Sequence, residues 1–168
     1  MVSPLDSVRA LLDRDLEALG REVEAYSDDA LPWVRIDGLP NPGGTLVLHL
    51  CGNLRHYVGA VLGHSAYVRD RPAEFSATDI PRTALVALVE QTRSEVAHAL
   101  EQVTPEILDR AFPEPVGGMT LQCGDFLLHL ASHLAYHLGQ LDYHRRFVTG
   151  EAAGVGAVNI RELASASP

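Results

Sequence analysis

The sequence predicts an all-α protein, a four-helix bundle with long connections and one short extra helix. Four long stretches place apolar residues three and four positions apart, which is the spacing of one face of an α-helix. No internal repeat is visible, and no region is rich in strand-forming patterns. We therefore expect one domain, a bundle over residues 1–150, followed by a small-residue tail over 151–168 that is loosely ordered.

The first helix is expected to begin after Ser3 and to end near Tyr26. Ser3 and Asp6 approximate a capping box, and Pro4 suits the first helical position. The apolar residues of this helix are Leu5, Val8, Leu12, Leu16, Leu19 and Val23. Their spacing predicts that one face of the helix is buried in the bundle.

The second helix is expected over residues 45–62, after a linker over 27–44 whose prolines and glycines exclude a long helix. Trp33 in this linker is expected to cover the core. Polar residues share one face of the helix, beside a face of aliphatic residues. These polar residues are His49, Asn53 and His56. Gly52 and Gly59 lie on another side, where we expect them to let a neighbouring helix come close.

The third helix is expected to open at residues 78–79, with Pro81 in its first turn. The connection before it, residues 63–80, carries four charged side chains that we expect to form a solvated loop with weak ion pairs. They are Arg69, Asp70, Arg71 and Glu74. A short turn over 104–112 and a loop with a small hairpin are expected before the last helix, residues 124–147.

Composition excludes several classes of protein. A net charge of −9 and the absence of a basic stripe argue against a nucleic-acid partner. No apolar run is long enough to span a membrane, and the N-terminus lacks the basic segment of a signal peptide. Cys51 and Cys123 are too few for a disulfide framework, and we expect both to be structural. We expect a soluble, cytoplasmic protein with no membrane partner.

Half of the eight histidines lie on the last predicted helix, in one narrow arc beside a row of leucines. The polar residues of the arc are His129, His133, His137, Gln140 and His144, and the leucines are Leu127, Leu130, Leu134, Leu138 and Leu141. Imidazole is costly to bury without a partner, so the arc predicts a divalent-metal site. The competing interpretation is that these histidines are hydrogen-bonded core residues.

The spacing alone leaves the ligand pair open. Residues four apart stack one turn above another, so either His133 with His137 or His129 with His133 could bind one ion. His49, on the inward face of the second helix, is the best-placed third ligand. Three imidazoles would leave a coordination position open, as in catalytic zinc sites.

Three segments of the chain resemble the DinB superfamily and, within it, a branch known as a domain of unknown function. They are HLCGNLRHYVGAVLG (49–63), RDRPAEF (69–75) and HLASHLAYHLGQLDYHRR (129–146). The resemblance implies one metal ion, zinc or nickel, held by His49, His133 and His137 in a four-helix bundle. It also implies a homodimer. The residues expected to line the pocket or support the ligands are His129, Asn53, His56, Gln140 and His144.

Characterised relatives of that superfamily include thiol transferases and a thiol-dependent isomerase. The resemblance therefore implies a metal-dependent enzyme, similar to a thiol S-transferase, that acts on a small molecule with a low-molecular-weight thiol. Such an ion can bind a thiol as thiolate and lower its pKa. Two alternatives stay open, a metal-dependent hydrolase and a non-catalytic metal-binding protein of the stress response.

The side of the last helix away from the leucines is uncharged where a solvent-facing surface would be polar. Its residues are Ser132, Tyr136, Gly139 and Tyr143. We expect this side to pack on another element or on a second copy of the chain.

Overall fold

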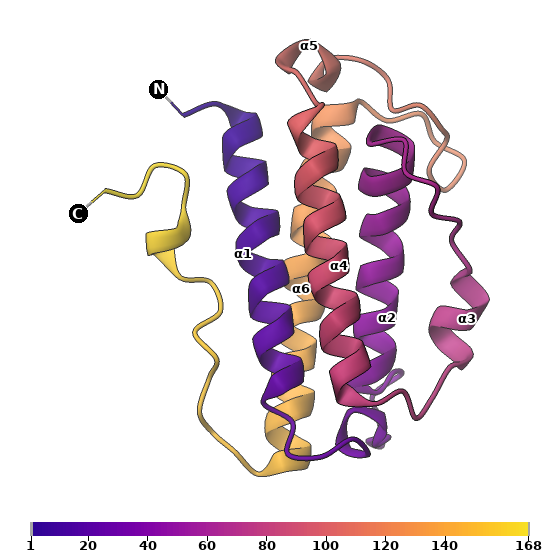
Figure 1. Ribbon diagram of the computed structural model, residues 1–168, viewed down its shortest axis with the longest axis vertical. Coiled ribbons are helices and arrows are strands. Elements are labelled where there is room, and N and C mark those ends of the chain that lie inside the picture. The colour runs from indigo at the N-terminus through magenta and orange to yellow at the C-terminus, as the bar shows by residue number, and fades with distance from the viewer. Residues whose placement is uncertain (1, 168) are drawn as a thin grey trace.

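The computed structural model describes residues 2–167 and contains four long helices packed side by side (Figure 1). They are α1 (Pro4–Glu24), α2 (Gly43–Leu54) with its π-helical extension η2 (Arg55–Leu62), α4 (Arg82–Glu101) and α6 (Cys123–Thr149). The connections hold α3 (Arg71–Ser76), α5 (Pro105–Leu108) and the 3₁₀ turns η1 (Leu31–Trp33) and η3 (Ile160–Glu162). The described residues form no β-strand, so the predicted all-α bundle is confirmed. The connections hold two short α-helices where one was predicted, because α3 forms in a segment that was expected to be a loop.

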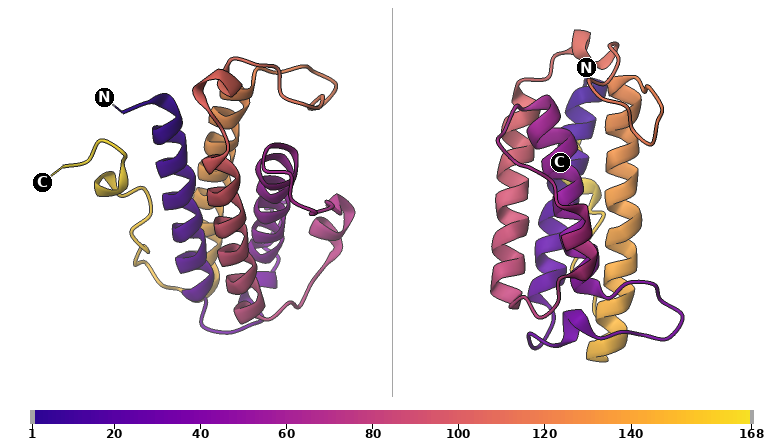
Figure 2. Two further views of the ribbon diagram at one scale, coloured as in Figure 1. Left: turned by 45° about the horizontal axis from the view of Figure 1, so that its top comes forward. Right: turned by 90° about the vertical axis from the view of Figure 1, so that its right-hand side faces the viewer.

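The order of the helices around the bundle explains the long connections. α1 packs on α4 and α6, and α2 with η2 packs on the same two helices, so α1 and α2 are diagonal neighbours. α1 and α6 run in one direction, and α2 and α4 run in the other (Figures 1 and 2). A chain that leaves the end of η2 must therefore return along the bundle before it enters α4. Residues 63–81 make this crossover, and α3 packs on α2 within it.

The helix starts show where local signals held and where packing overrode them. α1 begins as predicted, because the Ser3 side chain and the Asp6 carboxylate cap each other's backbone N–H groups. α2 begins earlier than predicted, at Gly43, where the absence of a side chain leaves room for the Tyr26 hydroxyl. α4 begins later than predicted, since Asp79 has a positive φ of 60° that interrupts a helix.

The predicted apolar faces of α1 and α6 are buried, and each buried leucine contributes about 1.5–3 kcal/mol of hydrophobic stabilisation. Trp33 packs against the core, and its indole N–H donates to the Ile80 carbonyl at 3.1 Å. At Gly63 the end of η2 approaches α4 closely, because a Cβ there would overlap Ala99 of α4. Gly59, which was expected in that role, has no neighbour closer than 3.6 Å to its Cβ position.

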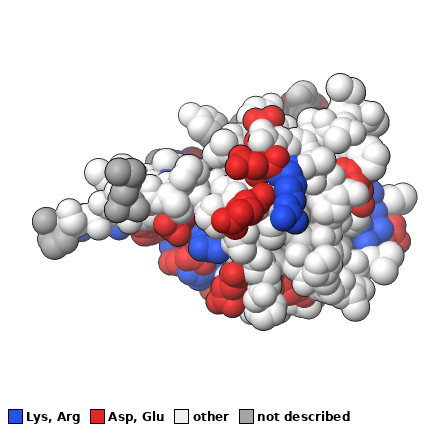
Figure 3. All heavy atoms as spheres, turned by 90° about the horizontal axis from the view of Figure 1, so that it is seen from above, with Lys and Arg blue, Asp and Glu red and all other residues white. Residues whose placement is uncertain are grey.

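The segments outside the bundle are short or extended. Two isolated bridges, Ala111–Gln122 and Val116–Met119, confirm the small hairpin before α6. The segment after Gly150 runs back beside α1 (Figure 1), where Arg21 of α1 donates to the Val155 carbonyl. Acidic and basic side chains are interspersed on the face at the α5 end of the bundle (Figure 3). Within residues 2–167, no helix combines the length and apolar character needed to cross a membrane.

Candidate metal centre

His49, His133 and His137 meet where α2 faces α6. One nitrogen from each ring lies within 4.8 Å of the others, and the Nε2 atoms of His49 and His133 are 3.4 Å apart. Two nitrogens bound to one tetrahedral zinc at about 2.0–2.1 Å would be separated by about 3.3 Å, so the spacing of His49 and His133 fits a shared ion. No second cluster of three such ligand residues occurs in residues 2–167. The three residues therefore form a site that could hold a metal ion.

His49 is oriented by the buried carboxylate of Glu74, from α3. Nδ1 of His49 and Oε2 of Glu74 are 3.0 Å apart, and Arg69 binds both oxygens of that carboxylate at 2.6 Å and 2.9 Å. Burial alone would raise the pKa of Glu74, but the bonds from Arg69 and His49 outweigh it and hold the pKa below its usual value. The ionised carboxylate keeps the proton on Nδ1 of His49 and leaves the Nε2 lone pair free for a metal ion.

The expectation that Arg69 and Glu74 belong to a solvated loop is wrong. The Glu74 side chain is only 6% exposed, because the crossover brings α3 back against α2. Gly52 makes this possible, since a side chain there would collide with the Glu74 carboxylate. Gly52 therefore lets a neighbouring helix, α3, come close as expected, and the group it makes room for is the Glu74 carboxylate. The sequence signal for this contact was Gly52, a glycine three residues after the candidate ligand His49, which indicates that another group approaches the helix closely there.

Gly52→Ala is expected to weaken zinc binding about 10–100-fold, the usual effect of losing the partner that orients a metal-binding histidine. The added methyl would displace Glu74 and leave His49 free to rotate. Titration calorimetry with zinc measures this change. Gly59→Ala is the matched control on the same segment, because its added methyl has room, and it should bind as wild type. Equal affinities for the Gly52 variant and wild type would contradict the role of Glu74.

The two α6 histidines are held in the unprotonated form. Nδ1 of His137 lies 2.7 Å from Oε1 of Gln140, which directs Nε2 toward the cluster as Glu74 does for His49. The ring centroid of His133 lies 4.6 Å from that of His137. Burial, followed by the neighbouring charges of His137 and His49, lowers the pKa of His133 to about 4. Burial also lowers the pKa of His137. Both rings are therefore ready to bind a metal at neutral pH.

The other predicted pocket residues lie on neighbouring turns of α2 and α6, and each has different partners. His129 is exposed and stacks on Phe126 and His133, at centroid distances of 5.9 Å and 6.2 Å, and its nitrogens are not part of the three-residue cluster. His56 binds Glu114 at 2.8 Å through Nε2. Asn53 is buried, and its Oδ1 has no hydrogen-bond partner among the described residues.

His144, also expected near the ion, has both ring nitrogens engaged elsewhere. Nε2 donates to the Val34 carbonyl at 2.8 Å, so Nδ1 accepts from the Tyr26 hydroxyl at 2.7 Å. Neither nitrogen is free to bind a metal. The buried ring instead joins α6 to Tyr26, which follows the end of α1, and to Val34 of the linker, contacts that the helical spacing of α6 alone could not indicate.

His144→Gln is expected to flatten the dependence of stability on pH between about pH 7 and 5. Burial lowers the pKa of His144, whereas a histidine in the unfolded chain titrates near 6.5. The contribution of neutral His144 to the stability of the fold is therefore complete above about pH 6.5 and is lost as the pH falls toward the folded-state pKa. Urea midpoints measured across this range test the effect. His98→Gln, at an exposed position, is the control, and equal slopes in all three chains would contradict the assignment.

A cavity of about 590 Å³ adjoins the cluster beside His137 and Gln140. The remaining lining residues come from the linker, the start of α2 and the outer side of α6. They are Leu39, Pro40, Asn41, Leu46, Tyr136, Gly139, Tyr143 and His144. Among the described residues, no Lys, Arg, Asp or Glu side chain lines this cavity.

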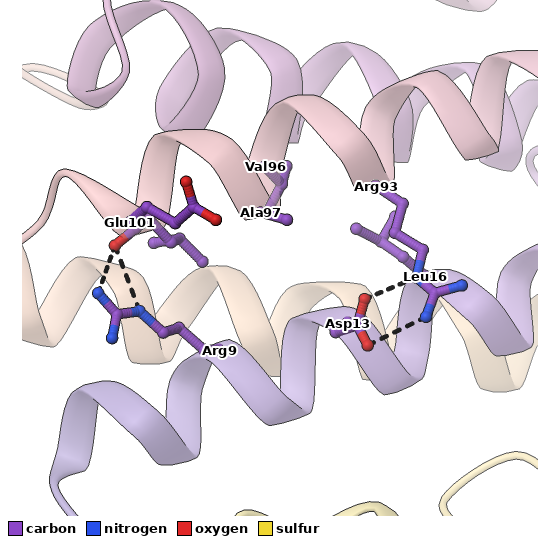
Figure 4. A pocket seen from close by; sticks show the side chains of 8 residues that line it. Arg9, Asp13, Leu16, Arg93, Val96, Ala97 and Glu101 are labelled. Atoms are coloured by element: carbon purple, nitrogen blue, oxygen red, sulfur yellow. Dashed lines mark hydrogen bonds and ion pairs between the residues drawn. The ribbon is translucent and has the colours of Figure 1, made fainter.

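A second cavity, of about 390 Å³, lies between α1 and α4. Figure 4 shows Arg93 of α4 facing Asp13 of α1, at 2.6 Å and 3.0 Å. Arg9 donates to the Leu100 carbonyl at 2.6 Å. Because these guanidinium groups already have partners within the chain, this cavity is not a candidate site.

Neither cysteine is a candidate nucleophile. Burial raises the pKa of Cys51 to about 12, and its side chain lies against Thr92 of α4. Burial also raises the pKa of Cys123, the first residue of α6. A buried thiol that stays protonated at neutral pH is unreactive, as the structural role expected for both residues requires.

Comparison with known proteins bears on the same residues. The family model of the DinB superfamily matches residues 5–141, which include the whole histidine cluster. No curated protein shows significant similarity to the chain.

Proposed function

The chain belongs to the DinB superfamily, and from this premise we propose that it is a metal-dependent enzyme similar to a thiol S-transferase. In this proposal His49, His133 and His137 bind zinc or nickel, and imidazole nitrogen suits both metals. The observation that carries the proposal is a set of three converging imidazoles with no fourth ligand residue in the cluster. A site of this kind keeps a coordination position for a second molecule.

The residues around the cluster support a two-substrate reaction. When bound, an ion at this site would lower the pKa of a thiol and favour the nucleophilic thiolate. Glu74 and Gln140 hold the Nδ1 protons of His49 and His137 and fix the directions of those rings. The uncharged cavity beside His137 has the volume of a small-molecule pocket and fits a neutral organic electrophile.

The test loads the purified chain with zinc or nickel and measures conjugation of bacillithiol, mycothiol and glutathione to 1-chloro-2,4-dinitrobenzene. The proposal expects a rate above that of His137→Ala with at least one thiol. No rate above that control would overturn it. A panel of ester, amide and lactone substrates run in parallel would then identify a metal-dependent hydrolase. Metal-dependent stability without either activity would identify a non-catalytic metal-binding protein.

We also propose that a second copy of the chain covers the outer side of α6. Tyr136 and Tyr143 are 66% and 78% exposed, so no other described element packs over them. Gly139 lies between them, where glycine costs about 1 kcal/mol relative to alanine. No atom lies within 4 Å of its Cβ position, so packing within the chain does not explain this glycine. A two-fold contact between copies near Gly139 would explain why a glycine is present there. The second copy would also form the outer wall of the cavity.

Light scattering is expected to give the mass of two chains for wild type and of one chain for Gly139→Glu. The glutamate would place a charge at the point of closest approach between the copies. Ala87→Glu, at an exposed position of α4 outside the proposed contact, shows whether any new charge on an exposed helix face has the same effect. A monodisperse wild-type monomer would contradict the dimer.

A further inference from the structure

Arg71 is an exposed cation close to the histidine cluster that the fold does not use. It is the first residue of α3, and within residues 2–167 its guanidinium makes no hydrogen bond or ion pair. It lies instead over the ring of Phe75, with Cζ 5.0 Å from the ring centroid. Arg69, two residues earlier, is already bound to both oxygens of Glu74. Arg71 forms none of the ion pairs expected of this connection, so its N–H donors are available to a ligand.

Phe75 places this cation beside the candidate metal centre. The Phe75 ring centroid lies 5.1 Å from that of His49, and the residue is 37% exposed, so it borders the cluster where solvent reaches it. Because the two centroid distances together come to about 10 Å, the Arg71 guanidinium lies no farther than that from the His49 ring. Contact with an aromatic ring restricts a guanidinium but leaves its N–H groups directed outward in its own plane.

The two sides of the cluster differ in charge. No Lys, Arg, Asp or Glu side chain lines the cavity beside His137 within the described chain. On the side of His49, Arg69 already balances the charge of the Glu74 carboxylate, so the charge of Arg71 is left without a counter-charge. A positive charge at the edge of a site attracts anionic ligands, which the net charge of −9 of the whole chain would otherwise repel.

We propose that Arg71 binds a carboxylate of the thiol substrate, so that the chain prefers low-molecular-weight thiols that carry a carboxylate over neutral thiols. This inference rests on the proposed function, whose other substrate would occupy the cavity beside His137. A guanidinium matches a carboxylate with two parallel N–H donors. In a peptide-like thiol, a carboxylate two residues from the sulfur lies up to about 7 Å from it, a span compatible with a sulfur at the histidine cluster and a carboxylate at Arg71.

The experiment uses the full chain loaded with cobalt(II), whose near-ultraviolet absorption reports a bound thiolate. Two probes are titrated, glutathione and glutathione diethyl ester, which share the thiol but differ in their carboxylates. Wild type should bind glutathione more tightly than the ester. Arg71→Gln is expected to bind cobalt as wild type does and glutathione about two- to fivefold more weakly, the effect of losing one exposed charge pair. Its affinity for the ester should be unchanged, and Arg71→Lys should retain most of the glutathione affinity.

Salt and a matched variant separate this effect from a general change in the chain. In about 1 M sodium chloride the difference between wild type and Arg71→Gln should shrink, because salt screens an exposed pair. Arg161→Gln removes the same charge at an exposed position of η3, which lies beside α1, and should bind both probes as wild type does. Unchanged glutathione binding by Arg71→Gln, or an equal loss for both probes, would overturn the inference. A wild-type chain that binds cobalt but neither thiol would overturn the proposed thiol chemistry itself, a result distinct from the other two.

Discussion

His133→Ala is expected to weaken zinc binding by at least about a hundredfold. His133 lies between the other two candidate ligands, with its Nε2 3.4 Å from that of His49 and its ring 4.6 Å from that of His137. A protein zinc site gains roughly 10–16 kcal/mol from its ligands together, so one of three accounts for several kcal/mol. Titration with zinc and nickel in the presence of a competing chelator measures the loss.

Two variants make this result specific. His98→Ala removes a histidine of α4 whose side chain is 76% exposed, and it should bind metal as wild type does. His129→Ala tests the ligand pair that helical spacing alone allows but that the three-residue cluster excludes. It should also keep its metal. Loss of binding with His129 instead of His137 would show that the ion lies one turn nearer the start of α6.

Helical spacing could predict the direction in which α6 side chains point, but not the level at which each meets another element. His133, His137 and His144 share one arc of the helix, and the arc was expected to face one site. The structure brings the first two to His49, whereas His144 reaches Tyr26 and the linker two turns later. A period of 3.6 residues gives the direction of each side chain around the helix axis. Only the packed bundle shows which residues of other elements lie at the same level along that axis.

The bundle itself was predictable because each long helix needs one continuous apolar face to be buried. Leucine spacing shows that face directly, and the buried residues of α1 and α6 match it. The position of Glu74 was not predictable in this way. It depends on a crossover that returns along α2 and on the absence of a side chain at Gly52. The residues around Glu74 in the sequence indicate neither feature. Charged residues in a connecting segment are predicted to be exposed to solvent unless the path of that segment is known.

Arg145→Met is expected to lower the free energy of unfolding by about 3–5 kcal/mol, the usual result of removing one partner of a buried ion pair. The Arg145 side chain is 2% exposed and binds Glu22 of α1, whose side chain is fully buried. Arg145 also donates to the Ala153 carbonyl at 2.9 Å. Urea unfolding measures the change. Arg146→Met, which breaks the more exposed pair with Asp142 on the same helix, should cost no more than about 1 kcal/mol.

The loss at Arg145 should also depend on pH, which a simple packing defect would not. Burial already raises the pKa of Glu22 despite the opposing effect of Arg145, and removing the guanidinium would raise it further. A raised folded-state pKa means that stability is retained at low pH and lost as the pH rises through that value. The free energy of unfolding of the Arg145→Met chain should therefore be closer to that of wild type at pH 5 than at pH 8. Glu22→Leu combined with Arg145→Met should recover most of the loss at both values, because it leaves no unpaired charge in the core. A pH-independent loss that the double variant does not relieve would show that the aliphatic contacts of Arg145, and not its charge, join α6 to α1.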